Sequence, residues 1–379
     1  MTPLEILKYF QDREGEIVSL IREIVDIESP SFDVEQSEKV TAWIERKAFG
    51  LGTSIRVERY IGEGCGKHIR IGPFDEPEQH TLIIGHSDTV HPIGTSEQNP
   101  TRVEGDRLYG CGVFDMKANI VVALEVLQFF AETKTPMREP VTLFFSCDEE
   151  VGSATGRPFI EREAAKADKC LVLEPSSNGR VKTSRKGTGM FLLRSHGVPA
   201  HAGLEPEKGA NAVAELARQV DKIHAIARPE LGTTVNVTTF HGGTTLNVIP
   251  EHAECEIDMR YSQASEAERV VSELRSLASM DERVSLELLG DVNRPPLERT
   301  EAVGALYEHA RDLAASFGYE LGETAVGGGS DGNFVAALGV PVLDGLGIAG
   351  DGAHRLDEYI LISDIAKRAT LLTLLLAAG

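Results

Sequence analysis

The chain has 379 residues, 41% of them hydrophobic and 26% charged, which is ordinary usage for a globular protein and excludes wholesale disorder and fibrous architectures. This length predicts two domains, or one large domain with an insertion. The formal net charge of -21 means that a nucleic acid or an anionic membrane surface would be repelled overall. We therefore expect neither nucleic acid nor a membrane as a partner.

The five cysteines indicate a reducing compartment. They are odd in number and have no CxxC spacing, so neither a disulfide framework nor a cysteine-ligated zinc is predicted. The N-terminal residues carry charges before any apolar stretch long enough for a signal peptide, and no apolar run reaches the roughly 18 residues of a membrane span. These features predict a cytoplasmic protein.

The first part of the chain predicts alternating helices and strands. Apolar residues at helical spacing predict one amphipathic helix over 3–28, and the apolar run at 81–85 is typical of a buried strand. The other elements expected here are a helix at 35–49, strands at 54–59 and 66–71, a helix at 117–132, a strand at 141–146, a helix at 155–166 and a strand at 170–174. This alternation predicts an α/β fold, with a mostly parallel sheet and helices on both faces.

The pattern changes after Pro175. A turn cluster precedes the segments 181–187 and 190–197, which are predicted to be paired strands. The elements that follow are a helix at 208–227, strands at 234–240 and 252–261, a helix at 265–280 and a strand at 284–289. Helices at 301–317 and 363–377 then return to the first pattern. We therefore predict one domain over 1–177 and 291–379, and a small α+β sandwich over 178–290 inserted into it.

Histidines and carboxylates recur where the predicted strands of the first domain end, which is where open α/β sheets carry their sites. They are His86, Asp88, Asp115, Asp148, Glu149, Glu150, Glu174 and, near the C-terminus, His354. Each is weak by itself, because a lone histidine at a strand end is more often structural and an acidic run is more often a solvated turn. At one edge of a parallel sheet, however, these anions would repel one another unless a cation neutralised them.

A metal site accounts for this pattern. Imidazole and carboxylate ligands without a thiolate suit Zn²⁺, with Co²⁺ or Mn²⁺ as substitutes. Two ions are favoured over one, because a carboxylate can bridge ions about 3.5–4 Å apart, and such a pair lowers the pKa of a water and polarises a scissile carbonyl. An adjacent carboxylate that is not a ligand can then act as the general base.

The motifs match a known family in order and spacing. The chain resembles the dizinc carboxypeptidase and deacylase clan over nearly its whole length, and within that clan it is most similar to the glutamate carboxypeptidases (carboxypeptidase G). The motifs that carry the resemblance are GHSDTV, YGCGVFDMK, DEEVGS, EP, HAG followed by GANAV, LNVIP, DMRY, GGGSDGN and GAH. Their combination is specific, although no single motif is.

The resemblance implies a zinc-exopeptidase-like catalytic domain that holds two Zn²⁺ per chain. His86 and Glu174 would hold one ion, Glu150 and His354 would hold the other, and Asp115 would bridge the two.

The resemblance also assigns roles beside the ligands. Asp88 would orient His86 through its second ring nitrogen, and Glu149 would be the general base and proton shuttle. The peptide bond between Asp115 and Met116 is implied to be cis.

The inserted domain, by the same resemblance, is a lid that carries the contact of a homodimer. His201 would reach a partner subunit's active site and polarise the substrate carbonyl, whereas Arg260 and Asn247 would hold substrate carboxylate and carbonyl groups. Gly328 and Gly329 resemble a backbone loop near the substrate. Without the family, a solvated loop histidine is an equally good interpretation of His201, and a surface ion pair is the usual one for Arg260.

Three features near these motifs receive a simpler interpretation. His91 is interpreted as an accessory loop residue and Cys147 as a small core hydrophobe. The glycines at 327–329 are not followed by a Lys-Ser/Thr pair, which excludes a P-loop.

The sequence thus predicts a zinc-dependent hydrolase that cleaves an amide bond to release a C-terminal amino acid from peptidyl or N-acyl substrates. One alternative is an N-acyl-amino-acid deacylase, of the acetylornithine deacetylase or succinyl-diaminopimelate desuccinylase type, and another is a dipeptidase. A non-catalytic metal-binding scaffold would keep the fold but would not need both Glu149 and a complete ligand set. The preferred amino acid or acyl group does not follow from the sequence, because the pocket is built from residues scattered along it.

Overall fold

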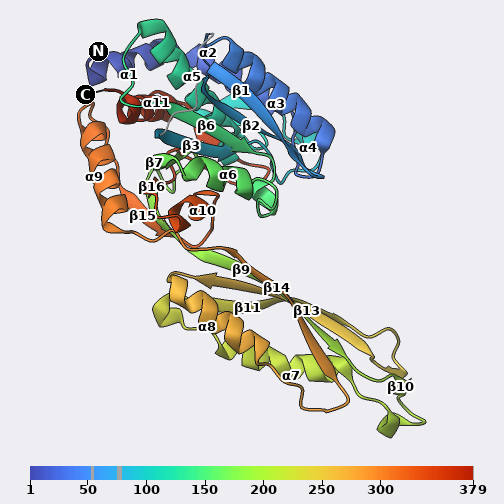
Figure 1. The fold of residues 1–379 in the computed structure, drawn as a ribbon. Coiled ribbons are helices and arrows are strands. Elements are labelled where there is room, and N and C mark those ends of the chain that lie inside the picture. The colour runs from blue at the N-terminus through green and yellow to red at the C-terminus, as the bar shows by residue number, and fades with distance from the viewer. Residues whose placement is uncertain (53–54, 75–78, 379) are drawn as a thin grey trace. The chain divides into compact units, whose positions relative to one another are not determined.

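The computed structural model of the protein describes residues 1–52, 55–74 and 79–378. The chain forms two compact units (Figure 1). Unit 1 comprises Met1–Ser184, Arg299–Ala325 and Ser330–Gly379, and unit 2 comprises Arg185–Glu298 and Val326–Gly329. Unit 2 is therefore an insertion that begins and ends somewhat later along the chain than the range 178–290 expected from the sequence.

Unit 1 is built on a mixed sheet of six strands in the order β1-β2-β6-β3-β7-β16. The strands β6, β3, β7 and β16 pair in parallel, whereas β1 and β2 are antiparallel. Their bounds are β1 Ile55–Gly62, β2 Gly66–Pro73, β3 His80–His86, β6 Val141–Ser146, β7 Ala167–Val172 and β16 Val342–Leu343. Of the predicted strand at 54–59, residue 54 lies outside the described residues.

Helices cover both faces of this sheet, as predicted. The helices of unit 1 are α1 Pro3–Asp12, α2 Glu14–Val25, α3 Val34–Phe49, α4 Thr95–Gln98, α5 Ala118–Thr133, α6 Arg157–Ala164, α9 Glu301–Ala315, α10 Gly332–Ala337 and α11 Ile362–Leu376. Two short turns also matter for the site: η1 Val113–Lys117 and η2 Glu149–Val151.

Alternate residues of the strands face different layers of helices. Leu143, Phe145 and Leu171 belong to an apolar cluster with buried residues of α1, α2, α3, α5, α9 and α11. On the opposite face, α6 and α10 pack against β7, and a Cβ added to Gly332 of α10 would lie 2.9 Å from Val172 of β7. Because the sheet is buried on both faces, the carboxyl ends of its parallel strands are the positions from which polar side chains can act.

Unit 2 contains an antiparallel sheet in the order β11-β13-β9-β14, with two helices packed on one face. Leu216 and Ile223 of one helix and Ile257 and Met259 of one strand belong to the apolar cluster between these layers. The bounds are β9 Gly187–His196, β11 Thr234–Gly242, β13 His252–Tyr261, β14 Ser285–Arg294, α7 Ala212–Ala225 and α8 Ala264–Arg275, with short turns η3 Pro206–Lys208 and η4 Pro229–Leu231.

The remaining strands form small sheets that the sequence analysis did not predict. An antiparallel sheet in unit 1 has the order β17-β18-β5-β4, and pairs are formed by β15 with β8 and by β10 with β12. Their bounds are β4 Arg102–Glu104, β5 Arg107–Tyr109, β8 Val181–Arg185, β10 Ala200–His201, β12 Val248–Ile249, β15 Glu323–Val326, β17 Gly350–Asp351 and β18 Tyr359–Leu361. Apart from β8, which falls within the predicted strand at 181–187, these strands have at most four residues and carry no periodic pattern that a sequence could reveal.

Two predictions about these elements are wrong. The helix expected over 3–28 is two helices, which separate at Arg13 (φ -103°, ψ 3°). Because α1 packs against α11 and α2 against α5, the break lets each helix bury its apolar face on a different partner. The segments 181–187 and 190–197 do not pair with each other either: β8 joins β15, and β9 lies between β13 and β14.

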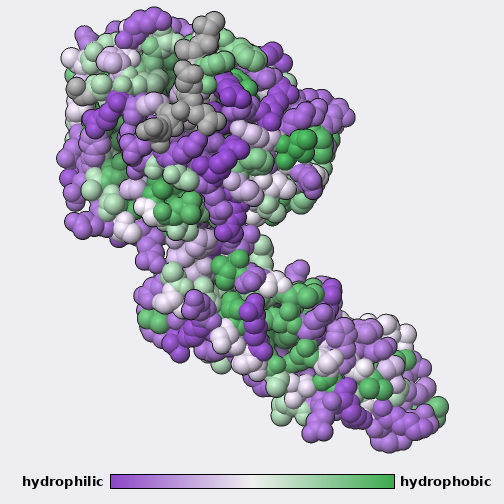
Figure 2. Space-filling model, viewed as in Figure 1, coloured by the Kyte–Doolittle hydropathy of each residue, from purple (hydrophilic) through white to green (hydrophobic). Residues whose placement is uncertain are grey.

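The surface is mostly polar, with hydrophobic residues among the polar ones on the visible face of unit 2 (Figure 2). The large exposed apolar side chains of this unit include Met190, Leu204, Phe240, Leu246 and Leu289. In the part of the chain that the structure describes, no helix combines the length and the apolar character needed to cross a membrane.

Candidate metal centre

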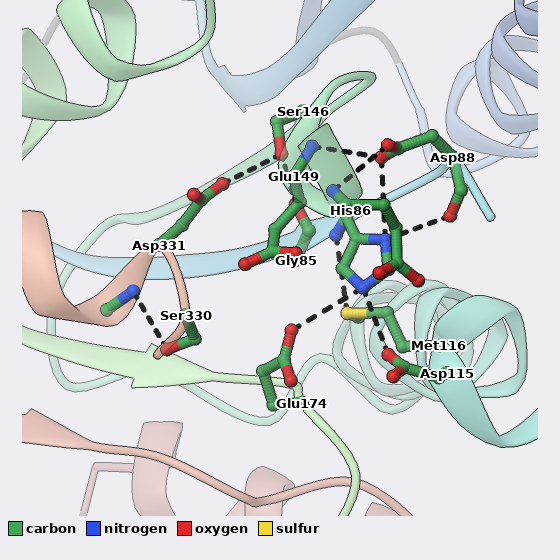
Figure 3. A network of polar contacts seen from close by, with 12 residues as sticks. Gly85, His86, Asp88, Asp115, Met116, Ser146, Glu149, Glu174, Ser330 and Asp331 are labelled. Carbon is green, nitrogen blue, oxygen red and sulfur yellow. Dashed lines mark hydrogen bonds and ion pairs between the residues drawn. The ribbon is translucent and has the colours of Figure 1, made fainter. Parts of the chain in front are cut away.

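The end of strand β3 carries His86 into the centre of a polar network (Figure 3). Its side chain is 1% exposed, and Nδ1 donates a hydrogen bond to the backbone carbonyl of Asp88 at 2.9 Å. This bond leaves Nε2 to face the carboxylates, because it fixes the proton on the other ring nitrogen. Nε2 lies 3.1 Å from Asp115 Oδ1 and 3.4 Å from Glu174 Oε1.

Asp115 lies in the turn η1, directly before helix α5. The Asp115–Met116 peptide bond is cis, as the family resemblance implies. Met116 packs beside Gly85 of β3, where an added Cβ would overlap the methionine side chain. The two carboxylate oxygens of Asp115 divide between two histidines: Oδ1 lies 3.1 Å from His86 Nε2, and Oδ2 lies 3.6 Å from His354 Nε2.

The turn η2, which follows β6, carries two adjacent carboxylates, Glu149 and Glu150. Glu150 Oε2 lies 3.1 Å from His354 Nε2. Carboxylate oxygens of both residues lie within 4.8 Å of a ligand atom of His86, that of Glu149 in a group with Glu174 and that of Glu150 in a group with Asp115. Glu150 therefore lies near both histidines, whereas Glu149 is grouped with His86 and Glu174.

Asp88 holds this turn in position. Its Oδ1 accepts a hydrogen bond from the backbone N–H of Glu149 and its Oδ2 from that of Glu150, each at 3.2 Å, and Ser31 Oγ donates to Oδ2 at 2.7 Å. The Asp88 carboxylate is 3.5 Å from His86 Nδ1, farther than the backbone carbonyl of the same residue. Asp88 therefore contacts His86 chiefly through its main chain, while its carboxylate anchors the acidic turn.

The side chains form two groups that share Asp115. One group contains His86 and Glu174, the other Glu150 and His354, and the distances from each histidine to its carboxylates are 3.1, 3.4, 3.1 and 3.6 Å. Zinc bonds of about 2.0–2.2 Å at tetrahedral angles separate neighbouring ligand atoms by about 3.3–3.6 Å. The donor atoms and their spacing therefore fit two cations of this size, with one oxygen of Asp115 turned toward each.

Electrostatics at the site favours positive charge at both histidines. Burial lowers the pKa of His86, but hydrogen bonds with Asp115, Asp88 and Glu174 raise it well above its usual value. Contacts with Asp115 and Glu150 raise the pKa of His354 to about 10. In the absence of metal, a proton on each histidine supplies this positive charge. A cation bound beside each histidine would supply it instead.

The pKa values of two carboxyl groups at the site depend on nearby positive charge. Burial raises the pKa of Asp115, but hydrogen bonds with His354 and His86 lower it more, so the net direction is downward. Burial raises the pKa of Glu150, and its contact with His354 offsets only part of that rise. Glu150 Oε1 is buried and has no hydrogen-bond partner among the described residues. Such an oxygen is costly unless a cation satisfies it.

The residues that the family resemblance assigns to the substrate belong to unit 2. His201 is an exposed residue of β10, and its Nδ1 accepts hydrogen bonds from the backbone N–H groups of Gly203 and Leu204, each at 3.1 Å. The backbone carbonyl of Asn247 accepts a bond from Ala202 N at 2.9 Å, which ties the two loops together. Because Nδ1 is an acceptor, the neutral ring of His201 carries its proton on Nε2.

Arg260 and the glycine loop are both engaged within unit 2. Arg260 donates to both carboxylate oxygens of Asp258, with distances of 2.8–3.1 Å. The backbone carbonyls of Gly328 and Gly329 accept hydrogen bonds from Arg185 Nη1 at 3.2 and 2.9 Å. The ion pair that the sequence analysis set against a substrate role for Arg260 is thus present in the structure.

Sequence reasoning did not single out two residues that contact the site. Ser31 binds Asp88, and Glu358 accepts hydrogen bonds from the turn of Asp115 and from His91. Glu358 follows His354 by four residues, a spacing that by itself resembles any charged loop. His91 is a loop residue as interpreted, and it is buried; Cys147 is a buried core residue as interpreted.

Comparison with known proteins is consistent with this geometry. Residues 82–378 match the model of peptidase family M20/M25/M40. The chain belongs to this family, and it is a metal-dependent hydrolase. The resemblance found in the sequence and the α/β fold class are therefore confirmed.

Individual relatives cover most of the chain. Carboxypeptidase G2 of Pseudomonas sp. (strain RS-16) is 29% identical over 94% of this chain and 88% of its own length. Succinyl-diaminopimelate desuccinylase of Delftia acidovorans is 33% identical over 75% of this chain and 77% of its own length. The crystal structure of aminopeptidase PepT from Bacillus cereus superposes with a TM-score of 0.78 at 21% identity, covering 96% of this chain and 98% of PepT, which shows the shared fold.

Proposed function

We propose that this chain is a dizinc carboxypeptidase that cleaves an amide bond and releases a C-terminal amino acid from peptidyl or N-acyl substrates. The observation that carries the proposal is the division of Asp115 between His86 and His354, with further carboxylates beside each histidine. Its likeness to carboxypeptidase G2 over 94% of the chain supports the reaction. The ions are proposed to be Zn²⁺, for which Co²⁺ or Mn²⁺ can substitute.

Each residue of the metal centre has a proposed role. His86 and Glu174 hold one ion, Glu150 and His354 hold the other, and Asp115 lies between them. The contacts of Asp88 support a positioning role: its main chain orients His86 and its carboxylate holds the Glu149–Glu150 turn.

When bound, the two ions supply a water of lowered pKa and polarise the scissile carbonyl. Glu149 accepts the proton of the attacking water and returns it to the nitrogen of the departing amino acid. The position of Glu149 supports this role. It is adjacent to Glu150 in the chain, and one of its carboxylate oxygens lies within 4.8 Å of ligand atoms of His86 and Glu174.

The lid residues are proposed to bind the substrate. His201 donates a hydrogen bond from Nε2 to the carbonyl oxygen, on which negative charge develops, and the acceptor role of Nδ1 supports this tautomer. Arg260 binds the free carboxylate of the substrate, with Asp258 sharing the guanidinium. Asn247 and the backbone of Gly328 and Gly329 complete the substrate contacts.

We propose that the active unit is a homodimer formed through unit 2, in which His201 of one protomer serves the metal centre of the other. Leu204 and Leu246 support this arrangement, because their side chains are 76% and 106% exposed beside His201 and Asn247. Exposed apolar residues on paired loops are typical of a surface that a partner covers. The cytoplasm is the proposed location, which fits five cysteines that are all free and buried.

A second candidate is an N-acyl-amino-acid deacylase. It is favoured by the 33% identity to a succinyl-diaminopimelate desuccinylase over 75% of the chain. Such an enzyme would use the same metal centre but would select the acyl group rather than the released C-terminal residue, and a dipeptidase would select a short substrate with a free amine.

A substrate panel separates these candidates. The zinc-loaded protein is assayed on C-terminal glutamyl dipeptides, N-acyl glutamates, other dipeptides, and N-acetyl or N-succinyl amino acids, and kcat/KM is determined from the amine released. If the chain is a carboxypeptidase, kcat/KM should depend strongly on which C-terminal amino acid is released. It should change little when the acyl or peptidyl group on the other side of the scissile bond is changed. Strong preference for one acyl group supports the deacylase instead. Hydrolysis of none of these substrates by protein holding two zinc ions would contradict both.

A further inference from the structure

Glu358 is a fully buried carboxylate next to the metal centre, in the segment between His354 and strand β18. Its Oε1 accepts hydrogen bonds from the backbone N–H groups of Phe114 at 2.8 Å and Asp115 at 2.9 Å. Its Oε2 accepts from the backbone N–H of Gly112 at 2.9 Å and from His91 Nε2 at 3.0 Å. An ionised carboxylate has about four acceptor positions, and here four donors occupy them.

The three backbone donors belong to the turn that carries Asp115. Gly112 has a φ of 71°, a left-handed conformation that favours glycine, and opens the turn before α5. Hydrogen bonds from neutral donors to an ionised acceptor are shorter and stronger than neutral pairs. Glu358 therefore fixes the backbone N–H of Asp115, whose carboxylate faces the histidines.

The same residue ties together two segments that supply metal ligands. The loop from Gly352 to Glu358 carries His354 and is closed by bonds from Arg355 N to Gly352 O at 2.8 Å and from Glu358 N to Arg355 O at 3.3 Å. Glu358 lies at the end of this loop and accepts hydrogen bonds from the turn of Asp115. The two segments therefore cannot shift independently.

We propose that Glu358, held by His91, is a positioning residue for the metal centre: it sets Asp115 and the loop of His354 at the separation that two ions require. This inference rests on the proposed function, because it assumes that Asp115 and His354 bind metal. It assigns Glu358 no contact with the ions or the substrate.

Glu358→Gln is the direct test, because the amide has nearly the same shape. Its oxygen can still accept two hydrogen bonds, but its NH₂ group would meet two N–H donors and accept from neither. The site is fully buried, so water cannot readily replace the lost acceptor. We expect the affinity for Zn²⁺ to fall by about 10–100-fold, the usual effect of removing a partner that holds a metal ligand.

His91 offers a matched pair of variants. His91→Gln keeps an N–H donor near the place of Nε2, whereas His91→Leu has a similar bulk and no donor. We expect His91→Leu to weaken zinc binding by about 10-fold, at the low end of that range, and His91→Gln to restore most of it.

Glu163→Gln is the control for loss of a buried carboxylate elsewhere. Glu163 of α6 is 6% exposed and accepts from Arg70 Nε at 2.9 Å and from Arg162 Nη2 at 3.0 Å. This variant should lower thermal stability and leave zinc affinity within about 2-fold of the wild type, because Glu163 bonds arginines and no proposed ligand.

In the experiment, each full-length protein is stripped of metal, checked for folding by circular dichroism and thermal melting, and titrated with Zn²⁺ against a chromophoric chelator. The Co²⁺ absorption spectrum reports ligand geometry independently of activity. Weaker binding by Glu358→Gln and His91→Leu, with rescue in His91→Gln, supports the inference. Folded Glu358→Gln with wild-type affinity and an unchanged Co²⁺ spectrum overturns it.

The remaining outcomes are equally decisive. If Glu358→Gln does not fold, the His91 pair decides, and equal zinc affinity of His91→Leu and His91→Gln overturns the inference. A wild-type protein that binds no zinc contradicts the proposed function itself, which distinguishes that failure from a failure of the positioning role.

Discussion

Glu149 and Glu150 are neighbours with different proposed roles, and exchanging each carboxylate for an amide separates those roles. Glu149→Gln keeps the shape of the side chain but removes the proton acceptor. Glu150→Gln removes a charge whose Oε2 lies 3.1 Å from His354 Nε2 and whose Oε1 is buried and unpartnered within the described residues. The first change should damage proton transfer, and the second should damage metal binding.

The two variants should change different quantities: Glu149→Gln should lower kcat, and Glu150→Gln should lower the affinity for zinc. A positioned general base contributes roughly 10²–10⁴-fold, so Glu149→Gln should lower kcat by that factor, about 3–5 kcal/mol in activation free energy. Its zinc content should stay close to two ions per chain. Glu150 stands directly in the proposed ligand group, so its loss should weaken zinc binding by at least the roughly 10–100-fold that follows removal of a more distant partner. Its kcat should recover in part when excess zinc is added.

The assay combines metal analysis after dialysis with turnover at saturating substrate, with and without added zinc. Full activity of metal-replete Glu149→Gln would refute the mechanism. The opposite pattern, with zinc lost from Glu149→Gln and retained by Glu150→Gln, would show that the two roles are reversed. The structure allows this reversed assignment, because a carboxylate oxygen of Glu149 lies within 4.8 Å of ligand atoms of His86 and Glu174.

Further predictions concern Arg260, His201 and His354. Arg260→Ala should lower kcat/KM by about 10–100-fold for free-acid substrates, as expected for a hydrogen bond between charged groups, and should spare C-terminal amides; equal losses would mean that its ion pair with Asp258 is only structural. Mixing inactive His201→Ala with inactive Glu149→Gln protomers should restore activity, and a mixture that exchanges subunits yet stays inactive would exclude action across the dimer. In metal-free protein, contacts with Asp115 and Glu150 raise the pKa of His354 from 6.5 to about 10, so their stabilising contribution is complete below about pH 6.5 and is lost as the pH rises through 10. The difference in melting temperature between the metal-free wild type and His354→Asn should therefore shrink from pH 6 to pH 10, and a constant difference would contradict this origin.

The sequence by itself determined the parts of this protein that depend on local pattern. Buried runs such as 81–85 and 141–146 identified the strands of the sheet because a strand covered on both faces must be apolar throughout. Residues at the ends of those strands pointed to the metal centre, since parallel strands bring their carboxyl ends to one edge. The family resemblance added the cis bond before Met116, which no pattern of polarity could indicate.

Only the tertiary structure decided features that depend on contacts between distant segments. The partners of α1 and α2, which separate at Arg13, follow from the packing of α1 on α11 and of α2 on α5, whereas the sequence shows only a stretch without large apolar side chains at 11–16. The strand β8 pairs with β15, more than a hundred residues away, although its neighbour in sequence offered a hairpin. Glu358 joins the turn of Asp115 across 243 residues of chain. Such contacts join residues that are far apart in the sequence, so no local periodicity predicts them. They determine the positions of the residues proposed to bind metal.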